Sequence, residues 1–297
     1  MLRLAHLSDV HLGPLPPVPF RALLSKRVTG WINWHRNRGR SMAVGTLDAL
    51  LADLAAARPD HVAVTGDLTN LALPAEIARA SEWLGALGPR GTVSAIPGNH
   101  DAYVPGALAR VTEAWAANMT GERIDDHAYP YLREIGPLAV IGCSSAEATA
   151  PFVAAGPFRD DQARRLEALL ARAGERGLFR AVLVHHPPVR GATGLRSRMW
   201  GIERFQRAVR GAGAELILHG HTHLPTLHAL PSPRGDVPVV GVAAAGQGLG
   251  GHRPPARLNL FEIEGGPGAW RCRQIERGLT ERGVAEVGRR ELVVPGR

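Results

Sequence analysis

Five short polar segments carry most of the side chains in this sequence that could do metal-assisted chemistry. They are SDVH with Asp9 and His11, GD with Asp67, GNHD with Asn99, His100 and Asp101, HH with His185 and His186, and GHTH with His221 and His223. Together these segments offer carboxylate oxygen, amide oxygen and imidazole nitrogen. That mixture suits Mn, Fe or Zn better than it suits Ca or Mg, which prefer all-oxygen ligand sets. The motifs therefore predict a transition-metal site.

Each polar segment follows a short apolar or β-branched run that is typical of a buried strand. The five runs cover residues 2–8, 61–65, 92–96, 180–184 and 215–218. Because loops at the carboxyl ends of parallel strands meet at one edge of a sheet, we expect the five segments to converge. A thiolate zinc site is excluded, because Cys143 and Cys272 are the only cysteines and form no CxxC pair.

The ordered series DxH, GD, GNH[DE], H and GHxH resembles the calcineurin-like metallophosphoesterases, and this chain departs from their pattern at no ligand position. The resemblance spans Leu2 to about Leu230. It implies that one metal ion is held by Asp9, His11, Asp67 and His223, and a second by Asp67, Asn99, His185 and His221. Asp67 would then bridge two divalent or trivalent ions, of Mn, Fe or Zn, about 3.5–4 Å apart.

The resemblance also implies the chemistry. Two divalent ions against two carboxylates leave about two positive charges, so the site suits an anion. A hydroxide held by both ions would attack phosphorus. His100 is expected to stabilise the phosphate or protonate the leaving group, with Asp101 orienting its imidazole. His186 is expected to stand behind the ligands, in a loop stiffened by two prolines.

The GNHD, HHPP and GHTH forms look most like the branch with class III cyclic-nucleotide phosphodiesterases and glycerophosphodiesterases. This likeness predicts phosphodiester hydrolysis, with monoester hydrolysis beside it, and cyclic nucleotides or glycerophosphodiesters as substrates. The alternatives are a lipid-phosphate hydrolase, a nuclease and a scaffold without catalysis. A scaffold should have lost ligands, and this chain has lost none.

Helical patterns at 44–57, 75–87, 160–172 and 203–209 alternate with the strands and predict an α/β fold, with Asp160 as a helix N-cap. The resemblance implies a four-layer αββα sandwich of two mixed β-sheets flanked by helices. Later strand-like runs at 238–243, 257–262 and 269–275 are expected to complete the second sheet. We expect one domain over 1–276 and a loosely attached extension over 277–297.

A basic aromatic insert at 14–40 directly follows the first metal loop. Its apolar positions recur at helical spacing among basic ones: Phe20, Leu23, Leu24, Val28, Trp31 and Ile32 among Arg21, Lys26, Arg27, Arg36, Arg38 and Arg40. One interpretation is an interfacial helix on an anionic membrane, or a cap over the site. The other is a surface helix pair that packs its Trp and Leu against the domain. Nucleic acid is disfavoured, because Gly30 and Gly39 interrupt the basic stripe.

Two loops beyond the motifs are candidates for the substrate pocket. The glycine-rich loop 244–255 is expected to pass close to the site, although its GxGxxG fragment lacks the following helix of a nucleotide fold. The loop 190–200 is either an anion contact or an ordinary connection. The seven remaining histidines are expected to have no metal role: His6, His35, His61, His127, His219, His228 and His252, of which only His252 lies in a loop worth watching.

No apolar run approaches the roughly 20 residues of a membrane span, and the N-terminus leads directly into the first strand. These features predict a cytoplasmic protein. If the insert binds lipid, the protein is expected at the inner face of the membrane as a peripheral protein. Two cysteines fit a reducing compartment, with a bridge between Cys143 and Cys272 as the alternative. The oligomeric state stays open.

Overall fold

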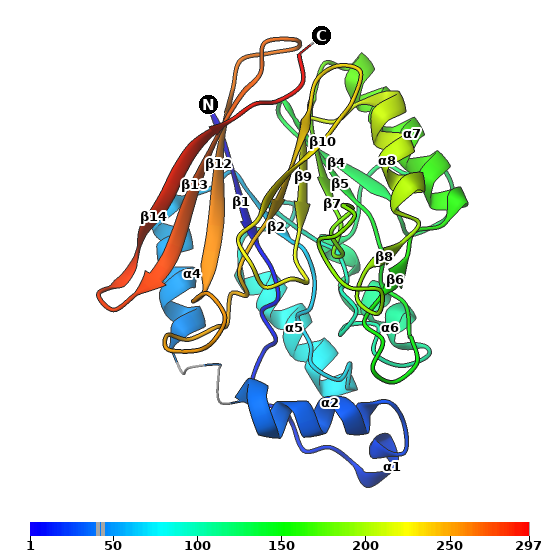
Figure 1. The fold of residues 1–297 in the computed structure, drawn as a ribbon, viewed down its shortest axis with the longest axis vertical. Coiled ribbons are helices and arrows are strands. Elements are labelled where there is room, and N and C mark those ends of the chain that lie inside the picture. The colour runs from blue at the N-terminus through cyan, green and yellow to red at the C-terminus, as the bar shows by residue number, and fades with distance from the viewer. Residues whose placement is uncertain (40–41, 43–44, 297) are drawn as a thin grey trace.

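Two six-stranded mixed β-sheets form the centre of the protein (Figure 1). The computed structural model describes residues 1–39, 42 and 45–296. In spatial order, the first sheet consists of β14 (Gly283–Leu292), β13 (Arg271–Thr280), β12 (Arg257–Glu264), β1 (Leu2–Leu7), β2 (His61–Val64) and β3 (Val93–Ala95). The second consists of β10 (Leu227–Leu230), β11 (Val237–Gly241), β9 (Leu216–His219), β7 (Phe179–Leu183), β5 (Leu138–Gly142) and β4 (Tyr131–Ile135).

Helices cover the outer faces of both sheets, as the expected αββα sandwich requires. Figure 1 shows α4 (Thr46–Ala57) beside β12–β14, and α7 (Asp160–Glu175) and α8 (Ile202–Ala212) outside the second sheet. The remaining elements are α1 (Phe20–Leu23), α2 (Arg27–Asn33), η1 (Trp34–Arg38), α5 (Pro74–Ala86), α6 (Ala107–Ala114), η2 (Ala116–Asn118) and a small parallel pair, β6 (Gly156–Pro157) and β8 (Met199–Trp200).

The strand sequences explain why the layers pack on both sides. In β7, Phe179, Ala181 and Leu183 join the core that contains residues of both sheets, whereas Val182 joins the core under α7 and α8. Successive side chains of a strand point to opposite faces, so a strand that is apolar at every position is buried on both. The mixed sheets of the predicted α/β fold are therefore confirmed.

The strands that precede the motifs run in parallel within each sheet. β1 pairs with β2 and β2 with β3 in the first sheet, and β7 pairs with β9 in the second. All five predicted strands are present, within one residue of the expected ends. Their carboxyl ends therefore bring the five polar segments to the same end of the molecule.

Three expectations about the fold are wrong. The runs at 257–262 and 269–275 form β12, which pairs with β1, and β13, which pairs with β12, so both lie in the first sheet rather than the second. The extension after residue 276 is not loose, because β14 pairs with β13 along its length as the edge strand. Asp160 is the first helical residue of α7 and not its N-cap, which is Arg159.

The insert forms α1, α2 and η1 and lies at the lower end of Figure 1. Trp31 packs against a small cluster with Leu71 and Tyr103, as one interpretation expected. Arg27 is partly buried, and its guanidinium donates to the carbonyl oxygens of Leu71 (2.8 Å) and Ala72 (2.8 Å). Arg40 and Arg297 lie outside the described residues.

No helix in the described part of the chain combines the length and apolarity that crossing a bilayer requires. The two cysteines are free and buried, Cys143 under the helices of the second sheet and Cys272 in the other core. The alternative of a bridge between them is therefore wrong.

Candidate metal centre

Backbone hydrogen bonds connect the loops that follow the strands. The amides of Asp9 and His11 donate to the carbonyl oxygens of Gly66 (3.0 Å) and Asp67 (2.9 Å). Gly98 must be glycine here, because a Cβ atom at this position would lie 2.2 Å from Asp67 Oδ1. The glycines of the motifs therefore let the ligand-bearing loops approach each other closely.

Strained backbone is concentrated at the motif residues. Eight non-glycine residues of the described chain have a positive φ, and five of them belong to the predicted ligand set: Asp9, His11, Asp67, His221 and His223. L-residues rarely adopt this region, and such strain persists where the surrounding structure holds a functional geometry in place. The backbone therefore marks the same site as the side chains.

The first group of side chains consists of Asp9, His11 and His223. Their ligand atoms all lie within 4.8 Å of one another, and His223 Nε2 is 3.1 Å from Asp9 Oδ1. His11 Nδ1 donates to the carbonyl oxygen of Thr69 (3.1 Å), which leaves Nε2 as the atom that faces Asp67 Oδ2 at 3.9 Å. A backbone carbonyl that fixes the tautomer in this way is typical of metal-binding histidines.

The second group brings His185 and His221 to Asn99. His185 Nδ1 and His221 Nε2 donate to the carbonyl oxygens of Thr65 (2.7 Å) and Ser197 (2.8 Å). The opposite nitrogens, His185 Nε2 and His221 Nδ1, lie 3.2 and 2.9 Å from Asn99 Oδ1, and each offers a lone pair when its ring is neutral. Lone pairs that converge in this way fit a cation at their centre.

Asp67 lies between the two groups. Its Oδ1 accepts the backbone N–H of His100 (2.8 Å), while its Oδ2 lies 3.4 Å from His185 Nε2. Asp9, Asp67 and His185 also form a set of ligand atoms within 4.8 Å of one another. The structure thus gathers all seven predicted ligand side chains, with Asp67 between the two groups.

The electrostatics of this site favour positive charge. Burial opposes ionisation of the Asp67 carboxyl, but the imidazoles of His185, His100 and His11 outweigh burial and hold its pKa well below the usual range. For His185, burial favours the neutral ring, yet Asp67 and Asp9 outweigh it and raise its pKa to about 9. A proton or a metal ion can supply the charge that these carboxylates attract, so metal binding displaces protons.

Asp101 does not orient the His100 ring, which corrects the role expected from the sequence. Its carboxylate accepts the backbone N–H groups of Asp67 (2.8 Å), Thr69 (2.9 Å) and Gly98 (2.8 Å). Asp101 therefore ties the GD loop to the GNHD loop. Burial and the nearby Asp67 carboxylate raise the pKa of Asp101 to about 7.

The His100 imidazole is oriented by a group that sequence reasoning missed. Its Nδ1 donates to the carbonyl oxygen of Asn70 (2.7 Å), and its ring lies 4.9 Å from the His11 ring. Asn70 is itself held, because its backbone N–H donates to buried Glu76 (2.8 Å), which also accepts the amides of Leu71 and Leu73. The one local signal in the sequence is Glu76 in the first turn of α5, a position from which a carboxylate can accept backbone N–H groups that precede the helix.

His186 stands behind the ligands, as expected. Its Nδ1 lies 2.7 Å from the Ser145 hydroxyl and its Nε2 2.8 Å from the carbonyl oxygen of Ala154. Both ring nitrogens are therefore engaged by the protein, and burial lowers the pKa of His186 well below its ordinary value. Ser145 and Ser197, each in a loop with no recognisable motif, were missed.

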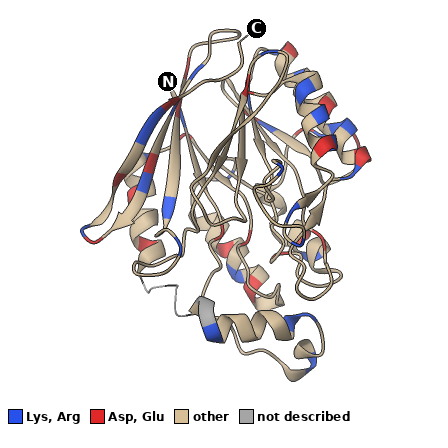
Figure 2. Cartoon of the chain, viewed as in Figure 1, with Lys and Arg blue, Asp and Glu red and all other residues tan. Residues whose placement is uncertain are grey.

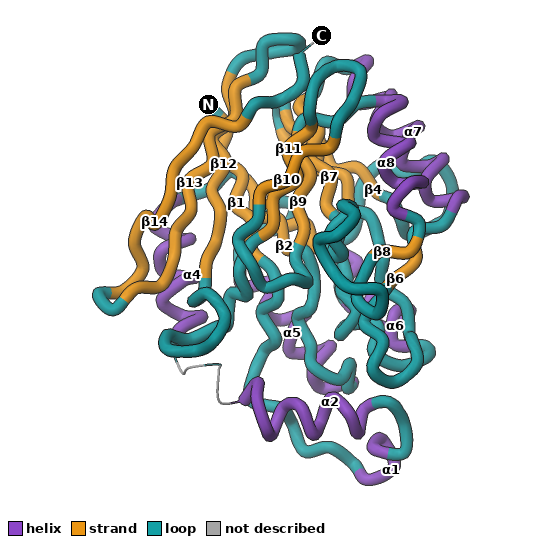
Figure 3. The backbone as a smooth tube through the Cα atoms, viewed as in Figure 1, coloured by secondary structure: helices purple, strands orange, loops and turns teal. Residues whose placement is uncertain are grey.

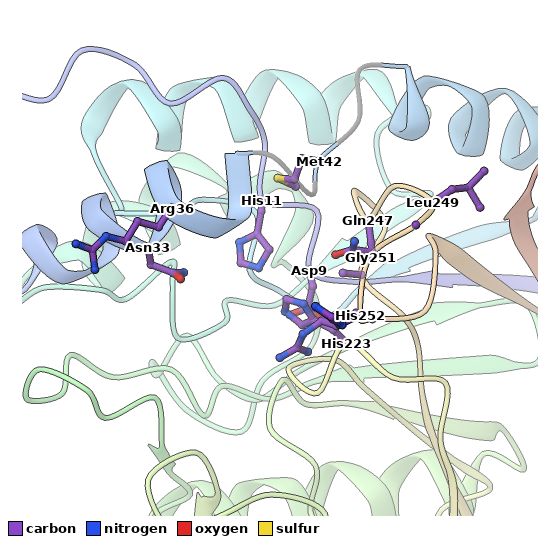
Figure 4. A pocket seen from close by; sticks show the side chains of 13 residues that line it. Asp9, His11, Asn33, Arg36, Met42, His223, Gln247, Leu249, Gly251 and His252 are labelled. Carbon is purple, nitrogen blue, oxygen red and sulfur yellow. The ribbon is translucent and has the colours of Figure 1, made fainter.

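A cavity of about 720 Å³ opens onto the first group of ligands (Figure 4). One side is lined by Asn33 and Arg36 of the insert, and another by Gln247 and His252 of the glycine-rich loop. Figure 4 shows the Asp9, His11 and His223 side chains between these two segments. The expectation that the loop 244–255 passes close to the site is confirmed, and His252 lines the cavity.

The other buried histidines are structural. His6 Nε2 lies 2.9 Å from the Thr65 hydroxyl and His61 Nε2 2.9 Å from the Ser94 hydroxyl. Burial lowers the pKa of both rings to about 3. His6, His61 and His219 are confirmed as buried residues with hydrogen-bond partners, outside the ligand groups.

Solved structures share this fold. A dimetal phosphatase from Danio rerio aligns over 98% of both chains with a TM-score of 0.63 and 13% identity. Sulfate thiohydrolase SoxB from Thermus thermophilus aligns over 99% of this chain and 56% of its own, with a TM-score of 0.50 and 16% identity. At these identities the likeness concerns the fold alone.

Sequence comparison leads to a family. Glycerophosphodiester phosphodiesterase GpdQ from Enterobacter lignolyticus (strain SCF1) is 33% identical over 190 residues, which are 63% of this chain and 57% of that enzyme. The family model for calcineurin-like phosphoesterases matches residues 2–225. With the sandwich fold and the gathered motif residues, this match shows that the chain belongs to the calcineurin-like phosphoesterase family.

Proposed function

We propose that this metal-dependent phosphoesterase uses two metal ions to hydrolyse phosphodiesters, with glycerophosphodiesters as the leading substrate class and cyclic nucleotides second. The observation that carries the proposal is the complete set of seven ligand side chains on converging strand ends. The preference for phosphodiesters is supported by the likeness to a relative named as a glycerophosphodiester phosphodiesterase.

One ion would be held by Asp9, His11, Asp67 and His223, and the other by Asp67, Asn99, His185 and His221. Imidazole nitrogen mixed with carboxylate and amide oxygen suits Mn, Fe or Zn. When bound, such a pair supplies a water-derived nucleophile at neutral pH and polarises the phosphoryl oxygens. His185 and His221 each place one ring nitrogen on a backbone carbonyl oxygen, so the other nitrogen is the one that would bind metal once the ring is neutral.

His100 would act on the substrate through Nε2. Because Nδ1 donates to the carbonyl oxygen of Asn70, Nε2 is the atom that can reach the substrate. The ring is partly exposed and lies beside His11, at the edge of the ligand groups. From this position a protonated Nε2 would stabilise the phosphate or donate its proton to the leaving alkoxide.

The cavity suits a small anionic diester. Its volume of about 720 Å³ falls in the ordinary range for small-molecule sites. Among the described lining residues, Arg36 and Arg253 are the charged side chains beyond the proposed metal ligands. Arg253 donates to the carbonyl oxygen of Thr222 (2.7 Å), so its position is fixed beside the GHTH loop. The two arginines would therefore balance the negative charge of a phosphate from opposite sides of the cavity opening.

The proposal is tested with chelator-stripped protein reloaded with Mn, Fe, Zn or Co in turn. We expect a higher kcat/KM for bis(p-nitrophenyl) phosphate than for p-nitrophenyl phosphate with at least one metal. Glycerophosphoethanolamine should then be hydrolysed faster than 3′,5′-cyclic AMP. A monoester preference of tenfold or more with every metal would contradict the assignment to diesters.

A further inference from the structure

Several large apolar side chains are exposed on segments around the metal end of the molecule, and six of them are considered together. Four lie on the insert and two on the loops 150–155 and 190–200, and together we call them the apolar rim: Phe20, Leu24, Val28, Ile32, Phe152 and Leu195. Phe20, Leu24, Phe152 and Leu195 expose 76, 73, 78 and 72% of their surface. Single exposed apolar residues are ordinary, but a gathered set of this size marks a contact surface.

Hydrogen bonds hold the three segments of the apolar rim together. Lys26 Nζ, on the insert, donates to the carbonyl oxygen of Val153 (2.8 Å), the neighbour of Phe152. The backbone N–H of Ala154 donates to the carbonyl oxygen of Arg196 (2.8 Å), the neighbour of Leu195. The rim is therefore one connected surface rather than three unrelated loop tips.

The insert turns its apolar side outward because its other side is fixed to the domain. A Cβ atom at Gly30 would lie 2.4 Å from Leu71 Cδ2, so α2 packs there at backbone distance. Arg27 bonds two carbonyl oxygens on the same side. Val28 and Ile32 are four residues apart on the same helix, so they share the opposite, exposed face.

The insert side of the apolar rim is basic. Residues 14–40 contain six basic and no acidic side chains. The stretches 148–158 and 187–201 contain no acidic side chain, and the acids that flank them, Glu147 and Glu203, pair with Arg159 and Arg190. Arg21, Arg36, Arg196 and Arg198 are exposed. Figure 2 shows only basic charged positions on α1 and α2. An apolar surface surrounded by arginine complements an anionic lipid interface.

We infer that the apolar rim docks into the surface of an anionic phospholipid bilayer, and that the metal centre acts on the phosphodiester of a lipid headgroup. The second half rests on the proposed function. Asn33 and Arg36 join the two halves, because they lie on the insert and also line the cavity at the ligands. A docked insert would therefore place the opening of the cavity at the headgroup layer.

Vesicle binding of the metal-loaded protein tests the docking. Vesicles of phosphatidylcholine with three parts in ten phosphatidylglycerol are compared with pure phosphatidylcholine vesicles by co-sedimentation. We expect at least tenfold tighter binding to the anionic vesicles, and a loss of tenfold or more in the double variant Phe20→Ser, Leu24→Ser. The matched control is Val293→Ser, which removes a similarly exposed apolar side chain (82%) just after β14 and outside the three segments of the apolar rim.

Three outcomes would overturn the docking. They are absence of binding to anionic vesicles, equal binding by the double variant, and a concentration-dependent dimer of the native chain that the double variant abolishes. The last result would mean that a second copy covers the apolar rim.

Turnover separates the docking from the proposed function. Phosphatidylglycerol in vesicles is compared with water-soluble glycerophosphoglycerol. The double variant should keep the rate on the soluble diester within twofold and lose the vesicle rate by tenfold or more. Hydrolysis of the soluble diester alone by the native chain would overturn the lipid substrate. Silence on both diesters with vesicle binding intact would overturn the proposed function and leave the docking standing.

Discussion

The Tyr103 ring stacks on the His100 imidazole, with ring centroids 5.2 Å apart and planes inclined by 16°. On the side of the insert, Lys26 Nζ lies 4.8 Å from the centroid of the same tyrosine, and the Thr29 hydroxyl lies 3.2 Å from its Oη. One aromatic ring therefore connects the proposed proton donor to the insert. The orientation of His100 depends on a residue outside the five motifs.

Replacing Tyr103 with alanine should lower kcat for diester hydrolysis by about tenfold, because His100 would lose the ring that holds its plane. Metal content should not change, since Tyr103 is not a ligand. Tyr103→Phe keeps the stacking ring and serves as the control, with nearly native kcat. Equal losses in both variants would mean that the hydroxyl, not the stacking, matters.

Gly98→Ala should lower metal content by at least half, because the new Cβ atom would lie 2.2 Å from Asp67 Oδ1 and displace that carboxylate. Gly85→Ala is the matched control. Gly85 lies in α5 with no atom within 4 Å of its added Cβ, and alanine there should stabilise the helix by about 0.5–1 kcal/mol. Elemental analysis after gel filtration measures the metal content of both variants. Native metal content in Gly98→Ala would refute the close approach of Gly98 to Asp67.

Asp101→Asn should act on stability rather than on catalysis alone. The amide offers one acceptor where the carboxylate accepts several backbone N–H groups, so at least two would lose their partner at a total of about 3 kcal/mol. Urea unfolding of the metal-free protein measures this loss, and Asp126→Asn at an exposed position is the control. Native stability combined with a large fall in kcat would restore the catalytic role that the sequence suggested.

Stability should fall as pH drops below about 6.5. Burial lowers the pKa of His61 to about 3 in the folded chain, against about 6.5 when unfolded. Between these values the unfolded chain binds a proton that the folded chain does not, so the free energy of unfolding decreases with falling pH. From pH 7.5 to 5, His61→Gln should lose about 2 kcal/mol less than the native protein.

Urea titrations of metal-free protein at the two pH values measure this difference. His252→Gln, at an exposed position, is the control and should follow the native chain. If His61→Gln also follows the native chain, His61 does not titrate between the two states as its burial requires.

The seven candidate ligand side chains could be located because each lies within four residues of a strand end, where short apolar runs and motif order are both local features. The contacts that orient them could not. Asn70, Ser197 and Thr65 act through backbone carbonyls, which any residue type could supply at those positions. Their roles depend on loop conformation, which periodicity does not encode.

The sheet order was only partly predictable. The runs that became β12 and β13 were recognised as strands, but the pairing of β12 with β1, which places both in the first sheet, is long-range, and their own residues do not specify it. β14 was missed because it is an edge strand with mostly exposed side chains and many charges, which reads as a polar tail. The insert was recognised as helical, whereas its outward apolar face follows from the close packing at Gly30.

Metal titration of the chelator-stripped protein tests the central claim most directly. Diester hydrolysis should rise as Mn is added and level off at two bound ions per chain, while Asp67→Ala should bind neither ion tightly and show no turnover, because both would share that carboxylate. Two tightly bound ions in Asp67→Ala, or two bound ions in the native chain without hydrolysis of bis(p-nitrophenyl) phosphate under Mn, Fe, Zn or Co, would contradict a bridged two-metal phosphodiesterase.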